Sequence, residues 1–249
     1  MRRSVLALAG LLALPAAAAA QDPIPGQLPP ARFAVTPFVG IRVPYSAGNA
    51  YLFTPEGGQY VIDEERGGGP VVGLEAQARL RGPVSLLGSI AFSDAGSTDI
   101  ALISPEDGTQ IPLRADNPST WMGKLAVAYR LPEPRPDNRR FRPAGYLVAG
   151  PALVRTDQHD DEGLGGDLSG ASNHWGLNLG VHTATTLGSP RLALHFGIED
   201  YLTFWDTDRL AEQEAAAYAI HFGEGTLVDF DYSSSNLVVL RAGLSFRFR

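Results

Sequence analysis

Charged, histidine and asparagine side chains occupy alternate positions inside several apolar stretches of this sequence. His182 and His195 lie on either side of Gly188-Ser189-Pro190, and Glu199 follows His195 in the second stretch. If this turn pairs the two flanking stretches, His182 faces His195 and Asn178 faces Glu199. Two histidines and a carboxylate could bind a transition metal. Buried clusters of this kind are more often held together by hydrogen bonds alone, so we expect no metal and no cofactor.

Other charged residues with the same alternation predict a larger network. If the faces that carry them are enclosed, cations and carboxylates must pair, because an unpaired buried charge is costly. We therefore predict an ion-paired polar network in an interior. Its predicted members are Glu75, Arg79, Lys124, Arg130, Asn178, His182, His195, Glu199 and Arg241.

The alternation itself predicts about eight β-strands. Successive side chains of a strand point to opposite faces, so apolar residues at every second position indicate a strand with two differently solvated faces. In residues 121–131, for example, Leu125 and Val127 share one face while Lys124 and Arg130 share the other. The predicted strands are 33–43, 71–81, 84–93, 121–131, 145–155, 175–187, 192–198 and 236–248.

The first residues predict export from the cytoplasm. Two arginines precede a short apolar run, which is followed by alanines up to Ala20. This is the order of a secretory signal peptide, which we assign to residues 1–20. The Pro-rich residues 21–31 are predicted to form an extended periplasmic leader. The chain has no cysteine, which excludes disulfides, thiolate chemistry and a lipid-anchored cysteine.

The connections between the predicted strands alternate in length. This alternation places long loops at one end of a barrel and short turns at the other, as in outer-membrane barrels with extracellular loops and periplasmic turns. The long connections are 44–70, 94–119, 156–173 and 206–234, and the shorter ones are 81–83, 132–140 and 188–190.

Charge is divided in the same way. The long connections hold 21 of the 27 acidic residues and only three basic ones, Arg66, Arg114 and Arg209. The turn side is richer in arginine. Without the signal peptide the chain has 18 basic and 27 acidic side chains, for a net charge of −9, so we expect no nucleic-acid partner.

These features favour a membrane-spanning barrel over a soluble one. A sheet can cross lipid only when it is closed, because every backbone polar group must be paired within the protein. Its outer face is then apolar and its inner face polar, although alternation alone also allows the reverse orientation. Trp121, Tyr129 and Trp175 lie near strand ends, where an interfacial girdle has aromatic residues. We predict an all-β fold, a closed antiparallel up-and-down transmembrane β-barrel over residues 32–249.

The last strand carries a more specific signal. Arg241, Gly243, Phe246 and Phe248 resemble the C-terminal signal of bacterial outer-membrane barrels, in which a glycine is followed by alternating aromatic residues; Arg249 is one residue beyond the usual aromatic end. By pattern, the mature chain resembles the small eight-stranded barrels of the OmpA/OmpX type. The resemblance implies that the outer-membrane assembly machinery recognises this strand. It also implies a monomer in the cell outer membrane, surrounded by membrane lipids and lipopolysaccharide.

The resemblance leaves three functions open. We expect a structural or surface-interaction role, with a polar interior and acidic extracellular loops. A narrow porin-like channel is the alternative, since different ion pairings inside the barrel could open a path. A lipid A-modifying or protease-type enzyme is the third possibility, and we do not expect the chain to be an enzyme.

Residues in the long connections supply the candidates for such an enzyme or for a cation site. Barrel proteases use Asp pairs and an Asp–His pair near the rim, and the closest counterparts are Asp206 with Asp208, Asp229 with Asp231, and His221. Ser93-Asp94 could mimic part of an acyltransferase site if a histidine folds near it. The acidic residues 157–162 with Asp167 could hold Ca²⁺, but they lack the spacing of an EF-hand, so we expect a solvated loop. Residues 210–220 contain good helix formers and predict a short helix.

Overall fold

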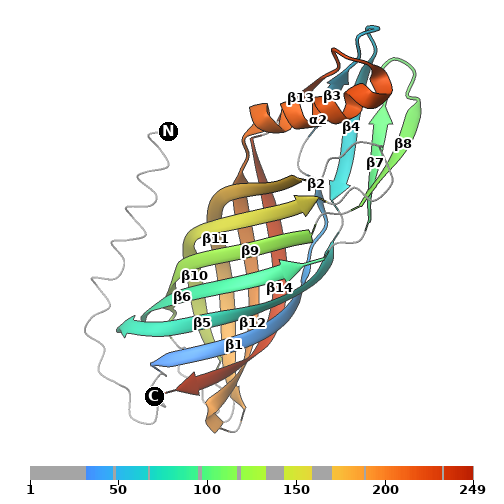
Figure 1. Cartoon of the computed structure of the whole chain (residues 1–249). Helices are drawn as coiled ribbons and strands as arrows, with labels where there is room; N and C mark the ends of the chain where they lie inside the picture. The colour runs from blue at the N-terminus through green and yellow to red at the C-terminus, as the bar shows by residue number, and fades with distance from the viewer. Residues whose placement is uncertain are drawn as a thin grey trace.

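A computed structural model of the chain describes residues 32–248 apart from 47–48, 67, 95–96, 117–118, 133–142, 159–169, 188 and 232. The predicted signal peptide and leader, residues 1–31, lie outside the described residues. Eight long strands make up the larger part of the molecule (Figure 1). They are β1 (Phe33–Arg42), β5 (Gly69–Arg81), β6 (Val84–Ser93), β9 (Ser119–Arg130), β10 (Ala144–Gln158), β11 (Gly170–Leu187), β12 (Ser189–Phe204) and β14 (Ser234–Phe248).

These eight strands form one closed antiparallel barrel. Their order around the barrel is β1-β14-β12-β11-β10-β9-β6-β5, so successive barrel strands are neighbours and β14 closes the barrel on β1. The closing register runs from Phe33 opposite Phe248 to Arg42 opposite Val239. The prediction of an eight-stranded, closed up-and-down barrel is confirmed.

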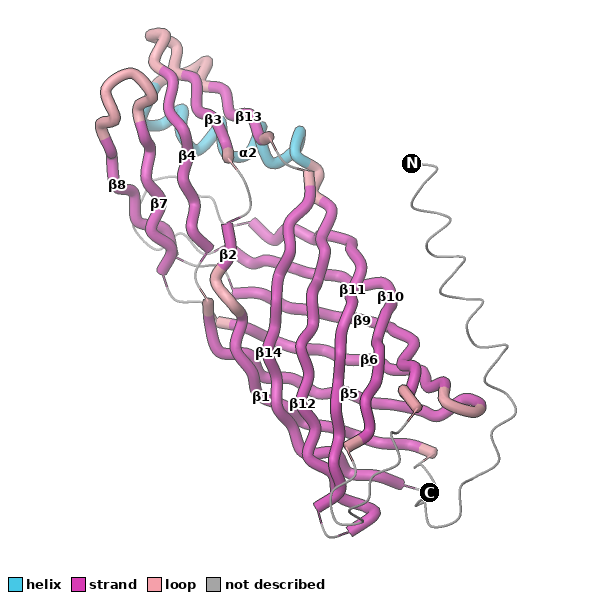
Figure 2. Tube along the Cα trace, turned by 180° about the vertical axis from the view of Figure 1, so that it is seen from behind, coloured by secondary structure: helices cyan, strands magenta, loops and turns pink. Residues whose placement is uncertain are grey.

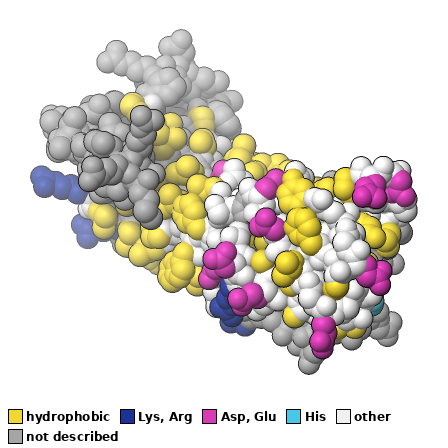
Figure 3. All heavy atoms as spheres, turned by 90° about the horizontal axis from the view of Figure 1, so that it is seen from above, with side chains coloured by type: hydrophobic (Ala, Val, Ile, Leu, Met, Phe, Trp, Pro, Cys, Tyr) yellow, Lys and Arg dark blue, Asp and Glu magenta, His cyan; other side chains and the backbone are white. Residues whose placement is uncertain are grey.

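The apolar faces of the strands point outward. Leu125, Leu179 and Phe246 are 55%, 49% and 42% exposed, whereas Lys124 and Arg241 are buried. Seen from above, Asp and Glu gather toward one end of the molecule, hydrophobic side chains cover the middle, and the opposite end shows Lys and Arg but no Asp or Glu (Figure 3). This is the distribution of a barrel whose outer surface lies in lipid, and it excludes the reverse orientation. No helix in the described part of the chain is long and apolar enough to cross a bilayer.

Three of the four long connections fold into a second sheet, which the sequence pattern did not reveal. The first contributes β2 (Tyr45–Ser46), β3 (Ala50–Phe53) and β4 (Gln59–Arg66), and the second contributes β7 (Ser97–Ile103) and β8 (Gln110–Asp116). The fourth contributes the helix α2 (Thr207–Phe222) and β13 (Leu227–Phe230). The order is β13-β3-β4-β7-β8, with β2 paired to β4. We call these strands and α2 the loop sheet; it continues the molecule beyond one end of the barrel (Figure 2).

The loop sheet has a buried core of its own. The core consists of Ala50, Leu52, Ile62, Leu102, Tyr218 and Val228. Tyr218 comes from α2, so the helix packs on the sheet. The N-cap residue of α2 is Asp206, whose side chain accepts a hydrogen bond from Arg209 N at 3.3 Å. The helix predicted for residues 210–220 is therefore confirmed, and it extends a little further at both ends.

Leu52→Ala tests whether this core is separate from the barrel. We expect a loss of about 2–5 kcal/mol in the stability of the loop sheet, because Leu52 is fully buried and truncation leaves a cavity. Limited proteolysis should then cleave the loops faster, while the heat-modifiable migration of the barrel on a gel stays unchanged. Leu227→Ala, at a position 63% exposed, is the control. Loss of barrel migration in Leu52→Ala would contradict the separation.

Candidate functional site

The densest group of charged and histidine side chains lies inside the barrel, midway along the strands. Glu75 on β5, Lys124 on β9, His182 on β11, Glu199 on β12 and Arg241 on β14 point inward, and all are buried. The inward direction of each of these side chains follows from the alternation along its strand, in which the two flanking residues face outward. We call these five residues the charged cluster.

Glu199 is the centre of the charged cluster. Its Oε1 forms an ion pair with Lys124 Nζ, lies 2.7 Å from His182 Nε2 and lies 3.1 Å from Arg241 Nε. Its Oε2 accepts a hydrogen bond from the Tyr201 hydroxyl at 2.9 Å. One carboxylate therefore contacts side chains from four strands.

Arg241 joins this carboxylate to the second one. Its Nη2 pairs with Glu75 Oε2 and lies 3.4 Å from both ring nitrogens of His182. Its guanidinium carbon is 4.5 Å from the centre of the Phe38 ring, a cation–π distance. Two carboxylates thus face two cations, which is the balance that burial of ions requires. The cluster ties the walls of the barrel together across its interior.

A glycine makes room for the cluster. A Cβ atom added at Gly197 would lie 2.7 Å from His182 Cδ2 and 3.1 Å from Arg241 Nε. We expect Gly197→Ala to lower the free energy of unfolding by about 1–3 kcal/mol, because overpacking displaces the paired side chains. Urea unfolding in micelles measures this loss. Gly88→Ala is the matched control, since the atom nearest to its added Cβ would be 3.9 Å away, and equal losses in both variants would contradict the prediction.

The predicted interior network divides into separate parts. Asn178 is buried in the interior, but its Nδ2 donates to the backbone oxygen of Asp200 at 3.4 Å rather than to the charged cluster. Arg79 lies at the turn end of β5, where it is exposed and its Nε donates to Gly82 O at 3.0 Å. Arg130 is partly buried at the turn end of β9. Alternation gives the face of each residue, but not its level along the barrel.

The predicted pairing of β11 with β12 is wrong by two residues. His182 lies opposite Gly197, not His195, and Asn178 lies opposite Tyr201. The register shifts between Thr186 and Leu187, next to the turn. A shift of two keeps every residue on its predicted face. The rings of His182 and His195 are therefore still close, 5.0 Å between centroids and nearly perpendicular.

The interior is not polar throughout, contrary to the predicted polar lumen. An apolar cluster lies on the loop side of the charged cluster: Phe38, Val71, Ala91, Met122, Ala152, Val154, Tyr201, Leu237 and Val239. A smaller one, Leu87, Ala126, Ala128 and Val148, lies toward the turns. Sequence reasoning missed Tyr201 and Phe38, although both have the inward phase of their strands. Filling by side chains is typical of an eight-stranded barrel.

One group of side chains has the composition of a metal site. Ligand atoms of Glu75, His182 and His195 all lie within 4.8 Å of one another. The Arg241 guanidinium already pairs with Glu75 and contacts His182, so a metal ion would have to displace it. We therefore expect Zn²⁺ to leave the unfolding midpoint unchanged in urea titrations. A Zn²⁺-dependent rise that disappears in His195→Ala would contradict this expectation.

The residues of the predicted assembly signal all have places in the folded barrel. Arg241 belongs to the charged cluster, and a Cβ added at Gly243 would lie 2.6 Å from Pro37 O on β1. Phe246 and Phe248 face outward, and Phe248 lies 6.1 Å from Phe33 between ring centroids. These contacts give the residues a role in closing the barrel. Recognition by the assembly machinery stays a prediction.

Three of the residues considered for catalysis lie in the described part of the chain as follows. Asp206 caps α2. Asp231 Oδ1 accepts from Asn49 N at 2.9 Å and joins two loop segments. Ser93 is fully buried at the end of β6. Of the proposed Ca²⁺ segment, residues 159–162 and Asp167 lie outside the described residues.

Comparison with known proteins gives matches only among solved structures, since no family model and no curated protein matches the chain. OprG from Pseudomonas aeruginosa is 12% identical, covering 88% of this chain and 97% of that chain with a TM-score of 0.48. A major outer membrane protein from Thermus thermophilus is 16% identical, covering 88% and 99%, with a TM-score of 0.43. Neisserial surface protein A is 13% identical, covering 87% and 97%, with a TM-score of 0.40. By its own closure, strand order and apolar exterior, the chain is a small eight-stranded transmembrane barrel of the outer-membrane type.

Proposed function

We propose that this protein is an outer-membrane barrel closed to solutes, which binds a partner outside the cell through its loop sheet. The observation that carries the proposal is the loop sheet itself, in which three connections combine around one core. Ordering so many loop residues costs conformational entropy, which the core offsets. Binding residues concentrate on loops that a rigid scaffold holds in place.

The charge of the loop sheet favours a cationic partner. Arg209 is the only Lys or Arg side chain described in these connections. Asp107 stays charged, because hydrogen bonds from Thr109 lower the pKa of its carboxyl below the ordinary value. Complementary charge speeds encounter and selects partners. The exposed acidic side chains include Glu56, Glu106, Asp107, Asp208, Glu212, Glu224, Asp229 and Asp231.

Binding of a labelled oligolysine peptide to the micelle-embedded barrel tests the proposal. We expect binding that weakens with salt and with the substitutions Glu212→Gln, Glu224→Gln and Asp229→Asn. Leu52→Ala keeps every charge but disrupts the sheet, so it should also weaken binding. Equal affinity for a neutral peptide, or full binding by Leu52→Ala, would rule out recognition by the folded loop sheet.

The filled interior supports a closed barrel rather than a channel. The charged cluster and the apolar clusters on both sides of it occupy the path that ions would take. In planar bilayers we expect no steady conductance, and a reproducible unitary conductance would favour the narrow channel. We propose no enzymatic role, so deletion of the protein should leave the lipid A mass spectrum unchanged.

A further inference from the structure

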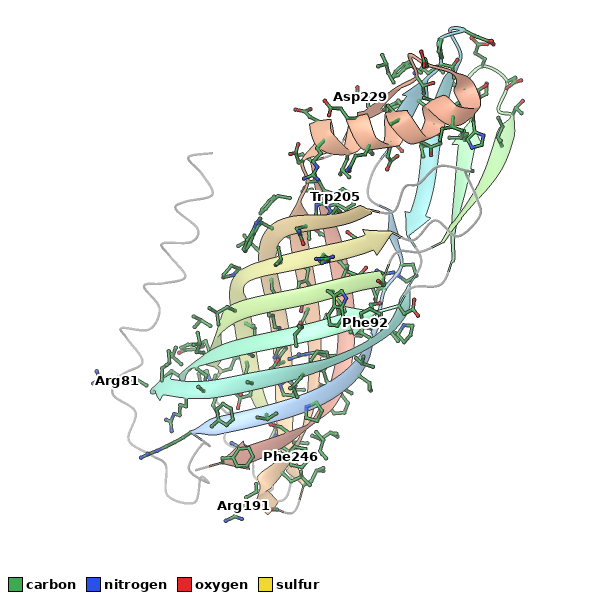
Figure 4. All side chains as sticks on the ribbon, viewed as in Figure 1. Arg81, Phe92, Arg191, Trp205, Asp229 and Phe246 are labelled. Atoms are coloured by element: carbon green, nitrogen blue, oxygen red, sulfur yellow. The ribbon has the colours of Figure 1, made fainter. Side chains whose placement is uncertain are left out.

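The turn end of the barrel is basic, in contrast to the loop end. The described segments at this end are 32–34, 77–87, 128–132, 143–148, 184–187, 189–194 and 244–248, and they contain six arginines but no Asp or Glu. Figure 4 shows two of these arginines, Arg81 and Arg191, at the end of the barrel away from Trp205. Five of the six have the inward phase of their strands. We call these five the mouth arginines, and they are Arg32, Arg79, Arg130, Arg191 and Arg247.

The inward phase follows from the burial of residues further along the same strands. Side chains two positions apart in a strand share a face. In four of the five strands the residue two positions nearer to the charged cluster is buried, and these residues are Ala34, Ala128, Ala193 and Ser245. Arg79 lies four positions from the buried Glu75 and so shares its face. Arg81 is the exception, because an irregularity after Arg79 places it opposite Val84, which has the outward phase of β6.

Three mouth arginines are neighbours on the inner face. Arg79 N donates to Arg32 O at 2.8 Å, so these two residues lie side by side across β1 and β5. Arg247 lies opposite Ala34 in the pairing of β14 with β1, and is therefore a diagonal neighbour of Arg32. Side chains that face each other across two strands have Cβ atoms about 5 Å apart, and diagonal ones about 7–8 Å. The three guanidinium groups can therefore reach one common ligand.

The surrounding inner face offers these three arginines no negative charge in the described segments. The inward polar side chains around them are uncharged and include Gln77, Ser85, Tyr146 and Ser245. Like charges on paired segments destabilise a sheet, and arginine cannot reduce its charge by losing a proton. An anion bound between Arg32, Arg79 and Arg247 would relieve this repulsion.

We propose that Arg32, Arg79 and Arg247 bind a soluble phosphate anion on the inner side of the turn end of the barrel. The planar guanidinium group suits this ligand, because it can donate two parallel hydrogen bonds to a phosphate. The Nε of Arg79 donates to Gly82 O at 3.0 Å, which fixes this side chain beside the turn and leaves its Nη groups as donors. The wall of the barrel separates the site from lipid head groups. The site lies at the opposite end from the loop sheet and is independent of any partner there.

Isothermal titration calorimetry with inorganic phosphate tests the proposal on the mature chain in maltoside micelles at constant ionic strength. We expect one saturable site that chloride does not occupy. Arg32→Gln and Arg247→Gln should each raise the Kd for phosphate about ten-fold, because each removes charge-assisted hydrogen bonds. Arg81→Gln is the matched control. It removes the same charge from the same end but from the outer face, so it should change the Kd by less than about two-fold.

Three outcomes would overturn the proposal. These are no saturable phosphate binding by the wild-type chain, equal weakening by Arg81→Gln and Arg32→Gln, and displacement of phosphate by phosphatidylglycerol but not by phosphatidylcholine. The second outcome would show diffuse attraction by net charge, and the third would place the arginines at the lipid surface. If Arg32→Gln does not migrate as a folded barrel on a heat-modifiability gel, Arg32→Lys replaces it. Lysine keeps the charge but not the planar donors, so the Kd should still rise, and an unchanged Kd would equally overturn the proposal.

Discussion

Glu199→Gln is expected to lower the free energy of unfolding of the barrel by about 3–5 kcal/mol, the cost of breaking a buried ion pair by removing one partner. Glu199 contacts Lys124, Arg241, His182 and Tyr201. Glutamine keeps the shape of the side chain but leaves two cations facing one carboxylate. Urea titration of the refolded protein in vesicles, followed by tryptophan fluorescence, measures the loss.

Two further variants show whether charge balance is the cause. Glu224→Gln changes the same groups at an exposed loop position and should stay within about 0.5 kcal/mol of the wild type. Adding Lys124→Met to Glu199→Gln restores one cation facing one carboxylate, Arg241 with Glu75. The double variant should therefore be more stable than Glu199→Gln alone. The Lys124→Met single variant completes the comparison. If the stability losses of Glu199→Gln and Lys124→Met simply add in the double variant, Lys124 and Glu199 are not coupled.

Leu125→Arg should cost about 2–4 kcal/mol, the cost of arginine on the lipid face of a barrel near the bilayer midplane. Leu125 points outward from β9, next to the inward Lys124 of the charged cluster, and is 55% exposed. If this surface were in water, the same substitution would change the free energy of unfolding by no more than about 0.5 kcal/mol. The two environments therefore predict results that a urea titration in vesicles separates clearly.

Leu227→Arg is the control for this variant. Leu227 is exposed on β13 of the loop sheet, outside the apolar band, so we expect almost no change in stability. If Leu125→Arg were as harmless as Leu227→Arg, the outer face of the barrel would be in water. The membrane assignment and the proposed function would then fail together.

Strand positions and faces could be predicted from the sequence because they depend on local geometry. Side chains alternate along any strand, so Leu125 and Lys124 had to lie on opposite faces whatever β9 paired with. The strand β6 has the predicted bounds, and β11 and β12 are longer than predicted. The helix formers of α2 act locally in the same way.

The level of each side chain and its partner could not be predicted in this way. Lys124 and Glu199 are 75 residues apart in sequence, and they meet only because of how the strands are staggered around the barrel. The irregularity between Thr186 and Leu187 shifts one pairing by two residues. That shift separates His182 from its predicted partner without changing its face.

The sequence alone therefore determined that each strand has an apolar and a charged face, and its last strand, its aromatic residues and its connections favoured a barrel with the apolar face outside. The exposure of Leu125 and the burial of Lys124 then excluded the reverse orientation. Only the tertiary structure decided that Arg79 and Arg130 lie away from the charged cluster, and that β4 pairs with β7 from another connection. The physical reason is that hydrophobic alternation has a period of two residues and is present in the sequence of each strand by itself. Register and loop pairing are instead set by hydrogen bonds between segments far apart in the chain, which no single segment encodes.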